Sequence, residues 1–363
     1  MNLFYIITFN LFLIIPNIVL FAQSTNESLT PKEIVVKYLD LYNERKFNER
    51  YNFLASISKT NINKDEYINF YKDVFESDIQ CVDIITSEIE AESNQSRYRR
   101  IKVDYFTSLK GEEYKQREYY TFINENGKWK IVWTRLMKAL ADEKVEISDF
   151  KKAIELFNKI IDMNPYDAYS YDRIAWCYIR DQNLAGETRK KEIFNNSKKA
   201  IFFEPDISEY YRTMSIYYHL EKLDNLQLDY INKAIDLALN ESDKSIYYSD
   251  LSQYYMDIDY SKSLDYINKA IQLNSSDPYC WYQLGIIHKN YKKYENAKDA
   301  FKKALLLKPM EDYFQAGLYG SYSYTCYSLN MYDVAKIYIV KALELDPTNS
   351  FYKFFFEINL KDK

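Results

Sequence analysis

Residues able to do chemistry are few in this chain and widely spaced. Only two histidines, His219 and His288, occur among 363 residues, so metal sites and histidine-based catalysis are poorly supplied. The four cysteines show none of the short spacings that bind zinc: Cys81, Cys177, Cys280 and Cys326. Three of them fall in expected helices at non-equivalent positions, so we expect buried free thiols, although an exported protein could pair them. We predict no metal, no cofactor and no enzymatic activity.

The clearest element is the stretch 278–309, which reads as one helical hairpin. Proline has no amide hydrogen and clashes with the preceding turn, so Pro309 should end its second helix. The two helices each present one regularly spaced face: Trp281, Leu284, Gly285 and His288, then Tyr294, Ala297, Phe301 and Ala304. This spacing is similar to the tetratricopeptide repeat, a unit of about 34 residues that forms a binding surface only by stacking.

A phrase built on Lys-Ala recurs between Asp149 and Pro347. Its equivalent small or apolar positions are 34 to 40 residues apart: Ile160, Ala200, Ala234, Ala270, Ala304 and Ala342. Such regular spacing predicts about six stacked hairpins over residues 137–349. The first helix would hold Met137, Leu140 and Ala141, directly after the last strand of the preceding segment.

Residues 350–363 predict a final helix that closes the last repeat. Its apolar face would contain Phe351, Phe354, Phe355 and Ile358. A membrane-binding helix is the alternative, but such helices carry a basic polar face that is missing here.

The segment before the repeats changes its periodicity midway. Residues 31–75 show helical spacing and predict three short amphipathic helices. From Ile79 the pattern alternates, which predicts four strands, and Asn126-Gly127 is a strong hairpin signal before the last one.

Three helices followed by four strands, ending in the strand KWKIVW, resemble the cone-shaped superfamily named after nuclear transport factor two, which has a cystatin-like fold. The likeness covers about residues 30–136 and implies a curved sheet that wraps the helices and leaves a pocket at its open end. Some members are enzymes, such as ketosteroid isomerases, which use an Asp base with a Tyr, or a His-Asp pair. The segment has no histidine, which leaves Asp83, Asp104, Tyr105 and Tyr119. We expect a solvated Asp and core-packing Tyr residues, as in the non-catalytic members.

Residues 1–22 carry no charged side chain, are mostly apolar and end in the small Ala22. They predict a secretory signal peptide cleaved after Ala22 and an α+β domain over 23–136. A retained N-terminal anchor is the alternative, because the apolar run is long enough to span a bilayer. We therefore expect an exported protein, periplasmic or in the cell envelope, with no stable membrane span after cleavage.

Composition agrees with a mainly α protein that carries an N-terminal α+β cone. Only 6 glycines and 7 prolines occur, which suits helices with short links better than many-stranded sheets. The net charge of −5 argues against a nucleic-acid partner, because binding phosphates needs clustered Lys and Arg.

The concave face of the repeats is the expected binding surface. Offsets from the repeat signature assign these residues to it: Tyr169, Asp172, Trp176, Arg212, Ile216, His219, Ser249, Gln253, Tyr282, Ile286, Lys289, Gly320 and Tyr324. The mixed aromatic lining favours an extended or helical peptide over an acidic tail. We therefore predict a non-enzymatic scaffold that binds a protein or peptide. The alternative is a cone domain that binds a small molecule or acts as an enzyme, with the repeats as a targeting handle.

Overall fold

The computed structural model describes residues 29–74, 80–89, 97–109, 112–181, 186–307 and 312–361. The predicted signal peptide, residues 1–22, lies outside them, as does Pro309. Residues up to Gln227 form one compact unit and those from Leu228 a second. The first unit therefore contains both the sheet and the first repeat helices.

The chain begins with four helices, α1 (Pro31–Asn43), α2 (Phe47–Tyr51), α3 (Ser56–Asn61) and α4 (Lys64–Val74). Thr30 and Glu33 form a reciprocal capping box, and Pro31 occupies the first turn of α1. The sequence predicted three helices here. The additional break arises because the Ala55 amide donates to the Ile131 carbonyl oxygen at 2.8 Å, a bridge to the sheet that interrupts the helical run.

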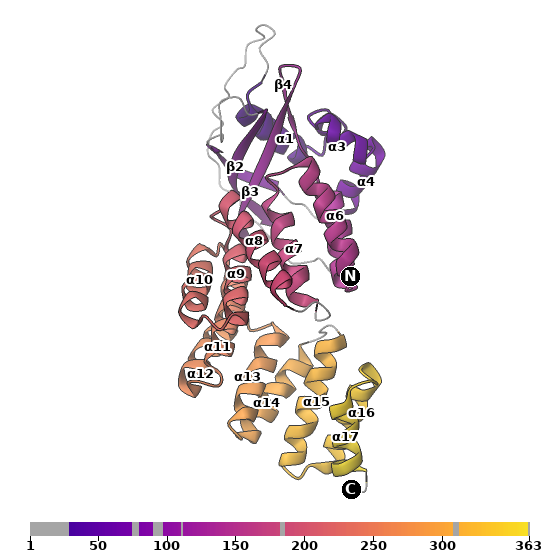
Figure 1. Ribbon diagram of the computed structural model, residues 1–363, viewed down its shortest axis with the longest axis vertical. Coiled ribbons are helices and arrows are strands. Elements are labelled where there is room, and N and C mark those ends of the chain that lie inside the picture. Colours follow the sequence, from indigo (N-terminus) through magenta and orange to yellow (C-terminus); the bar gives the residue numbers. More distant parts are fainter. Residues whose placement is uncertain are drawn as a thin grey trace. The chain divides into compact units, whose positions relative to one another are not determined.

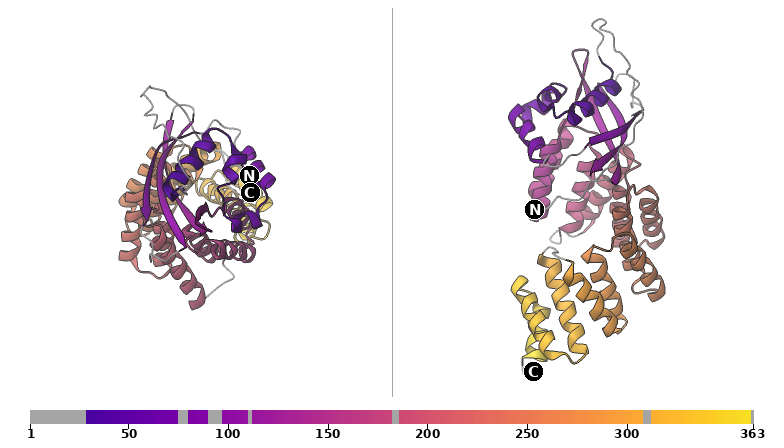
Figure 2. Two further views of the ribbon diagram at one scale, coloured as in Figure 1. Left: turned by 90° about the horizontal axis from the view of Figure 1, so that it is seen from above. Right: turned by 180° about the vertical axis from the view of Figure 1, so that it is seen from behind.

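Four antiparallel strands follow in sheet order β1-β2-β3-β4 and curve around α1 (Figures 1 and 2). They are β1 (Gln80–Ile89), β2 (Tyr98–Leu109), β3 (Glu112–Glu125) and β4 (Lys128–Ile131). Ile101, Val103 and Tyr105 are buried against the helices, so the alternate residues of β2 lie on the outer face. The predicted turn at Asn126-Gly127 is confirmed, since both residues have positive φ and Glu125 pairs with Lys128.

The first unit continues with α5 (Arg135–Glu146), α6 (Phe150–Met163), α7 (Ala168–Arg180), α8 (Glu187–Phe203) and α9 (Ser208–Leu220). Helices α5 and α6 pack as a pair, as do α7 and α8. As predicted, α5 contains Met137, Leu140 and Ala141 and begins directly after the last strand.

Residues 224–345 form α10 (Asp224–Leu237), α11 (Glu241–Tyr255), α12 (Tyr260–Leu273), α13 (Pro278–Asn290), α14 (Tyr294–Leu306), α15 (Asp312–Ser328) and α16 (Tyr332–Leu345). Side-by-side pairs form between α11 and α12, α13 and α14, and α15 and α16 (Figure 1). Within the described residues, the order of helices from α5 to α16 is that of six hairpins. The prediction of a mainly α chain with an N-terminal four-stranded sheet is therefore confirmed.

The recurring small positions explain why the helices pack closely. All six predicted positions, from Ile160 to Ala342, are at most 2% exposed. Gly285 shows the closest approach, because a Cβ placed there would lie 2.4 Å from the Phe301 ring. Only glycine allows the two helices of this hairpin to come so near. The four cysteines are buried free thiols, as expected.

The last helix, α17 (Ser350–Phe355), continues into a π-helical turn, η1 (Phe356–Leu360). Its buried residues are Phe355 and Leu360, whereas Phe351, Phe354 and Ile358 are more than half exposed. The prediction of one buried face containing Phe351, Phe354, Phe355 and Ile358 is therefore wrong for three of the four. The π turn accounts for Ile358, because it places residues five apart, here Phe355 and Leu360, on the same side, whereas Phe351 and Phe354 precede the turn.

Candidate functional site: a groove of the C-terminal repeats

A groove of about 710 Å³ lies in the second unit, between residues of α13, α15 and α17. Four predicted residues line it: Tyr282, Lys289, Gly320 and Tyr324. Its remaining lining is mostly aromatic or polar: Asn290, Lys292, Tyr294, Phe314, Gly317, Ser321, Asp346, Asn349, Phe351 and Tyr352. The groove therefore offers several rings for apolar contact and two lysines for a negative group.

Small residues on α15 keep the groove open. A Cβ at Gly320 would lie 2.5 Å from the Tyr352 ring, and one at Gly317 would lie 3.3 Å from the Tyr282 hydroxyl oxygen. These two glycines are three residues apart, so they lie on one face of the helix. Bulkier residues at either position would push the aromatic rings into the space between the helices.

Charge in this groove comes from Lys289, Lys292 and the carboxylate of Asp346, so positive groups exceed negative ones by one. Burial lowers the pKa of Lys289 below the usual lysine value, because desolvation disfavours the ammonium form. A carboxylate next to Lys289 would relieve that cost. Asn349 caps α17 by accepting hydrogen bonds from the amides of Phe351 and Tyr352, and so fixes the start of the last helix at the groove.

Four other predicted residues, on α13, α11 and α9, do not line this groove. Ile286 lies half-buried in the hydrophobic cluster around Phe301. Gln253 on α11 is exposed and Ser249 is half-buried. In the first unit, His219 is exposed and its Nδ1 lies 3.3 Å from the Gln227 side-chain oxygen.

Other predicted residues lie where α5, α7 and α9 pack. The Tyr169 hydroxyl donates to Asp142 at 2.6 Å, and the Arg212 guanidinium lies 5.6 Å from the Trp176 ring centre. Ile216 is half-buried. Asp172, however, is only 1% exposed, so it lies beneath the surface and does not line it. Burial and the nearby Glu209 raise the pKa of Asp172 to about 8.

Sequence reasoning missed much of the groove lining. The offsets predicted residues one helix at a time. Phe351 and Tyr352 come from α17, where the Tyr352 ring lies against Gly320 of α15, and Phe314 lies in the first turn of α15. A usable signal was the Gly317-Gly320 pair, since two glycines on one helical face favour a close approach of other side chains.

The catalytic candidates on the strands are not arranged as an acid–base site. Asp104 and Tyr119 lie on the outer face, and Asp83 lies at a β-bulge with φ of 51°. Tyr105 does point inward, where its hydroxyl donates to Glu118 at 2.9 Å, and Glu118 is paired with Arg135. Arg50 also fills this interior, with its guanidinium 3.7 Å from the Tyr38 ring centre.

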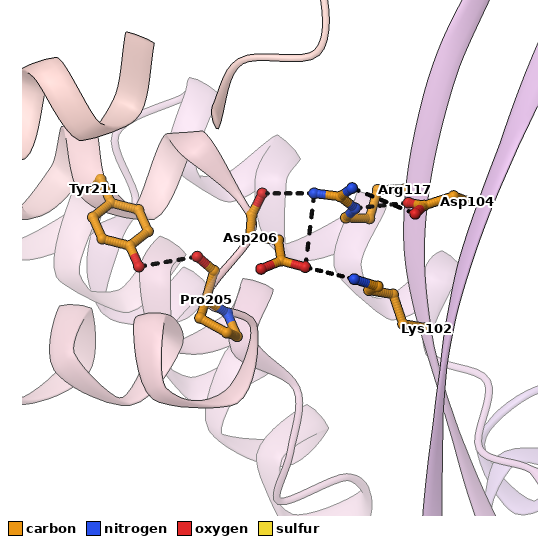
Figure 3. Close-up of polar contacts among 6 residues, drawn as sticks. All are labelled: Lys102, Asp104, Arg117, Pro205, Asp206 and Tyr211. Carbon is orange, nitrogen blue, oxygen red and sulfur yellow. Dashed lines mark hydrogen bonds and ion pairs between the residues drawn. The ribbon is translucent and has the colours of Figure 1, made fainter. Parts of the chain in front are cut away.

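The outer face of the sheet is bound to the repeats by a set of charged contacts, drawn in Figure 3. Arg117 pairs with Asp104 at 2.7 Å and also donates to the Asp206 carbonyl oxygen at 3.3 Å. Lys102 donates to the Asp206 carboxylate at 2.7 Å. Asp104 thus has a structural partner, and it helps to hold the α8–α9 link against β2 and β3.

Among the described residues, no cluster of three or more His, Cys, Asp or Glu side chains could hold a metal ion. None of the helices in the described part of the chain is both long enough and apolar enough to cross a bilayer.

Comparison with known proteins identifies the repeats. Residues 278–310 and 316–349 each match a model of the tetratricopeptide repeat. The curated TPR repeat-containing protein MJ1428 of Methanocaldococcus jannaschii is 28% identical over 178 residues, which are 43% of this chain and 29% of that protein. The chain therefore matches less than a third of the length of this relative.

Two solved structures share the fold at low sequence identity. The human IFIT1 dimer with m7Gppp-AAAA has a TM-score of 0.51 and 16% identity, over 64% of this chain and 57% of that one. The APC/C hetero-tetramer Cut9-Hcn1 has a TM-score of 0.50 and 18% identity, over 58% of this chain and 40% of that one. The chain thus carries tetratricopeptide repeats with the helical-repeat architecture of these structures.

Proposed function

We propose that this tetratricopeptide-repeat protein is a non-enzymatic scaffold that holds a protein partner in the C-terminal groove. The observation that carries the proposal is the meeting of Tyr282, Lys289, Gly320 and Tyr324 at one groove of about 710 Å³. Repeats of this kind suggest a protein-interaction role, and a groove of this size and shape accommodates a few side chains of an extended segment.

The lining indicates the chemistry of the partner. Aromatic rings such as Phe314 and Tyr324 suit apolar or aromatic side chains, and Lys289 with Lys292 suits a carboxylate. A peptide segment that alternates apolar and acidic residues would satisfy both. The nuclear-transport-factor-two-like sheet domain then serves to hold the first repeats, through contacts such as Lys102 with Asp206.

The enzymatic or small-molecule alternative has less support. Asp104 is engaged by Arg117 on the outer face, and the inward Glu118 is engaged by Arg135, which stabilises its ionised form. Burial opposes ionisation of Glu118, but Arg135 and hydrogen bonds from Tyr120 and Tyr105 outweigh it and hold the pKa below the usual range. A carboxylate held in this way is a poor general base.

A photo-crosslinking amino acid tests the groove directly. p-Benzoylphenylalanine at position 324 should capture a protein in the producing cells, whereas the same amino acid at Lys302, on the exposed face of α14, should not. Lys289→Glu in the crosslinking chain should weaken the adduct. Equal adducts from both positions, or none from position 324, would contradict the proposal.

We also propose that the protein is exported, because residues 1–22 have the composition of a signal peptide. Mass spectrometry of the purified protein should find an N-terminus at Gln23. An intact Met1 in a membrane fraction would favour the retained anchor, and an intact Met1 in the cytoplasm would exclude export.

A further inference from the structure

A cavity of about 370 Å³ lies in the first unit, on the outer face of the sheet. Its walls come from β1, β2 and β3, from the end of α8 and from the links that follow α6 and α8. The aromatic residues of this outer-face cavity are Tyr98, Tyr119, Tyr166, Phe202 and Phe203. Phe202 is 71% exposed, so its ring is open to a ligand. This size and lining are typical of small-molecule sites.

Arg100 lines the same cavity, and part of its guanidinium has no acceptor. The guanidinium carbon lies 5.5 Å from the Tyr119 ring centre and 5.7 Å from that of Phe203. Its Nη2 donates to the Phe203 carbonyl oxygen at 2.8 Å. Nε is buried without an acceptor, and Nη1 also has none among the described residues. The side chain is only 11% exposed, and a buried cation with unmatched donors is costly, so this arrangement favours an anion in the cavity.

The other charged residues of the lining already have partners. Lys102 donates to the Asp206 carboxylate at 2.7 Å (Figure 3), and the Arg99 Nε lies 4.0 Å from a Glu88 carboxylate oxygen. These two pairs balance each other in charge. Arg100 is therefore the cation of the lining that has no carboxylate within the lining itself.

Glu204 is next to Arg100 but compensates its charge only in part. It does not line the cavity, and its Oε1 lies 3.7 Å from the Arg100 Nη2, which is longer than a hydrogen bond. Burial and the charge of Asp167 raise the pKa of Glu204 to about 7, while Lys138, Arg100 and a hydrogen bond from Tyr210 oppose this rise. At neutral pH Glu204 is thus only partly ionised, which leaves positive charge on the cavity wall.

We propose that the outer-face cavity binds a small organic anion that carries an aromatic ring. Its carboxylate or phosphate group would pair with Arg100, and its ring would pack against Phe202 and Tyr166. The inference goes beyond the proposed function, because the groove of that function belongs to the second unit. It also differs from a site inside the cone, since Arg100 lies on the outer face of the sheet. Both the sheet and the first repeats contribute walls, so the bound anion should stabilise the first unit.

Isothermal titration calorimetry on the purified full chain tests the chemistry of the ligand. We expect 4-hydroxyphenylacetate or phenyl phosphate to bind, and the tighter of the two identifies the anionic group. Tyramine, which carries an ammonium on the same kind of ring, should not bind. Acetate, which lacks the ring, should bind more weakly by roughly tenfold or more. No binding of either aromatic anion at millimolar concentration, or equal binding of tyramine, would overturn the proposal.

Four variants locate the binding. Arg100→Gln should weaken it by roughly tenfold or more, because a charge-assisted hydrogen bond is lost. Phe202→Asp alters an exposed side chain, so the fold should be kept, which circular dichroism checks, while its charge repels the anion. Lys115→Gln, at an exposed position of β3, and Lys289→Glu, in the groove of the second unit, should leave the affinity unchanged. Unchanged affinity in Phe202→Asp, or a loss in Lys289→Glu, would reject this cavity as the site.

Discussion

The buried carboxyl of Asp172 should make stability depend on pH. Burial and Glu209 raise its pKa to about 8, against the hydrogen bond from Thr213 and the charges of Arg173 and Arg212. Between the usual aspartate pKa and 8, the folded chain keeps this proton and the unfolded chain releases it. The free energy of unfolding should therefore fall as pH rises through this window, by up to about 1.4 kcal/mol per pH unit from this group.

The change Asp172→Asn isolates this contribution. It removes the ionisation but keeps the size of the side chain, so the fall in unfolding free energy between about pH 5 and 8 should be shallower than in the wild-type chain. Urea denaturation at several pH values measures it. Asp162→Asn, on the exposed side of α6, is the control and should leave the slope unchanged. A wild-type slope in Asp172→Asn would show that this carboxyl is ionised in the folded chain.

Substitution by alanine should destabilise the chain at Gly285 and have little effect at Gly317. The Cβ of Gly285→Ala would meet the Phe301 ring at 2.4 Å, so a loss of about 1–3 kcal/mol is expected from overpacking. The Cβ of Gly317→Ala would meet only the movable tip of Tyr282 at 3.3 Å, and alanine favours the helix, so stability should stay within about 1 kcal/mol. Chemical denaturation compares them, and similar losses in both would contradict the packing argument.

Single positions were predictable where local periodicity determines them. The small or apolar residues from Ile160 to Ala342 are buried because each is at the same place in its own hairpin. The burial of Asp172 was not predictable in this way. That burial depends on how α9 packs against α7. An offset within one repeat carries no information about packing between two repeats.

At the scale of elements, the sequence predicted the repeat helices and the hairpin at Asn126-Gly127 because both depend on neighbouring residues. It missed the break between α2 and α3, which depends on a bridge from Leu54 to Ile131, far along the chain. It also missed the π turn after Phe355, where the spacing of the buried residues changes from α-helical to five. The break comes from a contact between segments far apart in the sequence, which a local periodicity does not contain.

The charged contact between Lys102 and Asp206 joins β2 to the α8–α9 link and should stabilise the first unit modestly. Both side chains are about a quarter to a third exposed, so water screens the pair. A double-mutant cycle with Lys102→Ala and Asp206→Ala should give a coupling of about 0.3–1 kcal/mol. The coupling should shrink in 1 M salt, where the Debye length is about 3 Å. A coupling near zero at low salt would show that Asp206 is held by Arg117 alone.

At the scale of the whole molecule, the repeat architecture predicts that a destabilising substitution affects mainly the repeats next to it. Each repeat contacts mainly its neighbours, so a destabilised hairpin opens without the distant parts of the chain. Hydrogen–deuterium exchange should therefore show faster exchange in α13 to α16 of Gly285→Ala, with β2 and β3 unchanged. Asp206→Ala should show the reverse, with faster exchange in α8 and α9. Faster exchange throughout the chain in either variant would mean that the two units open together.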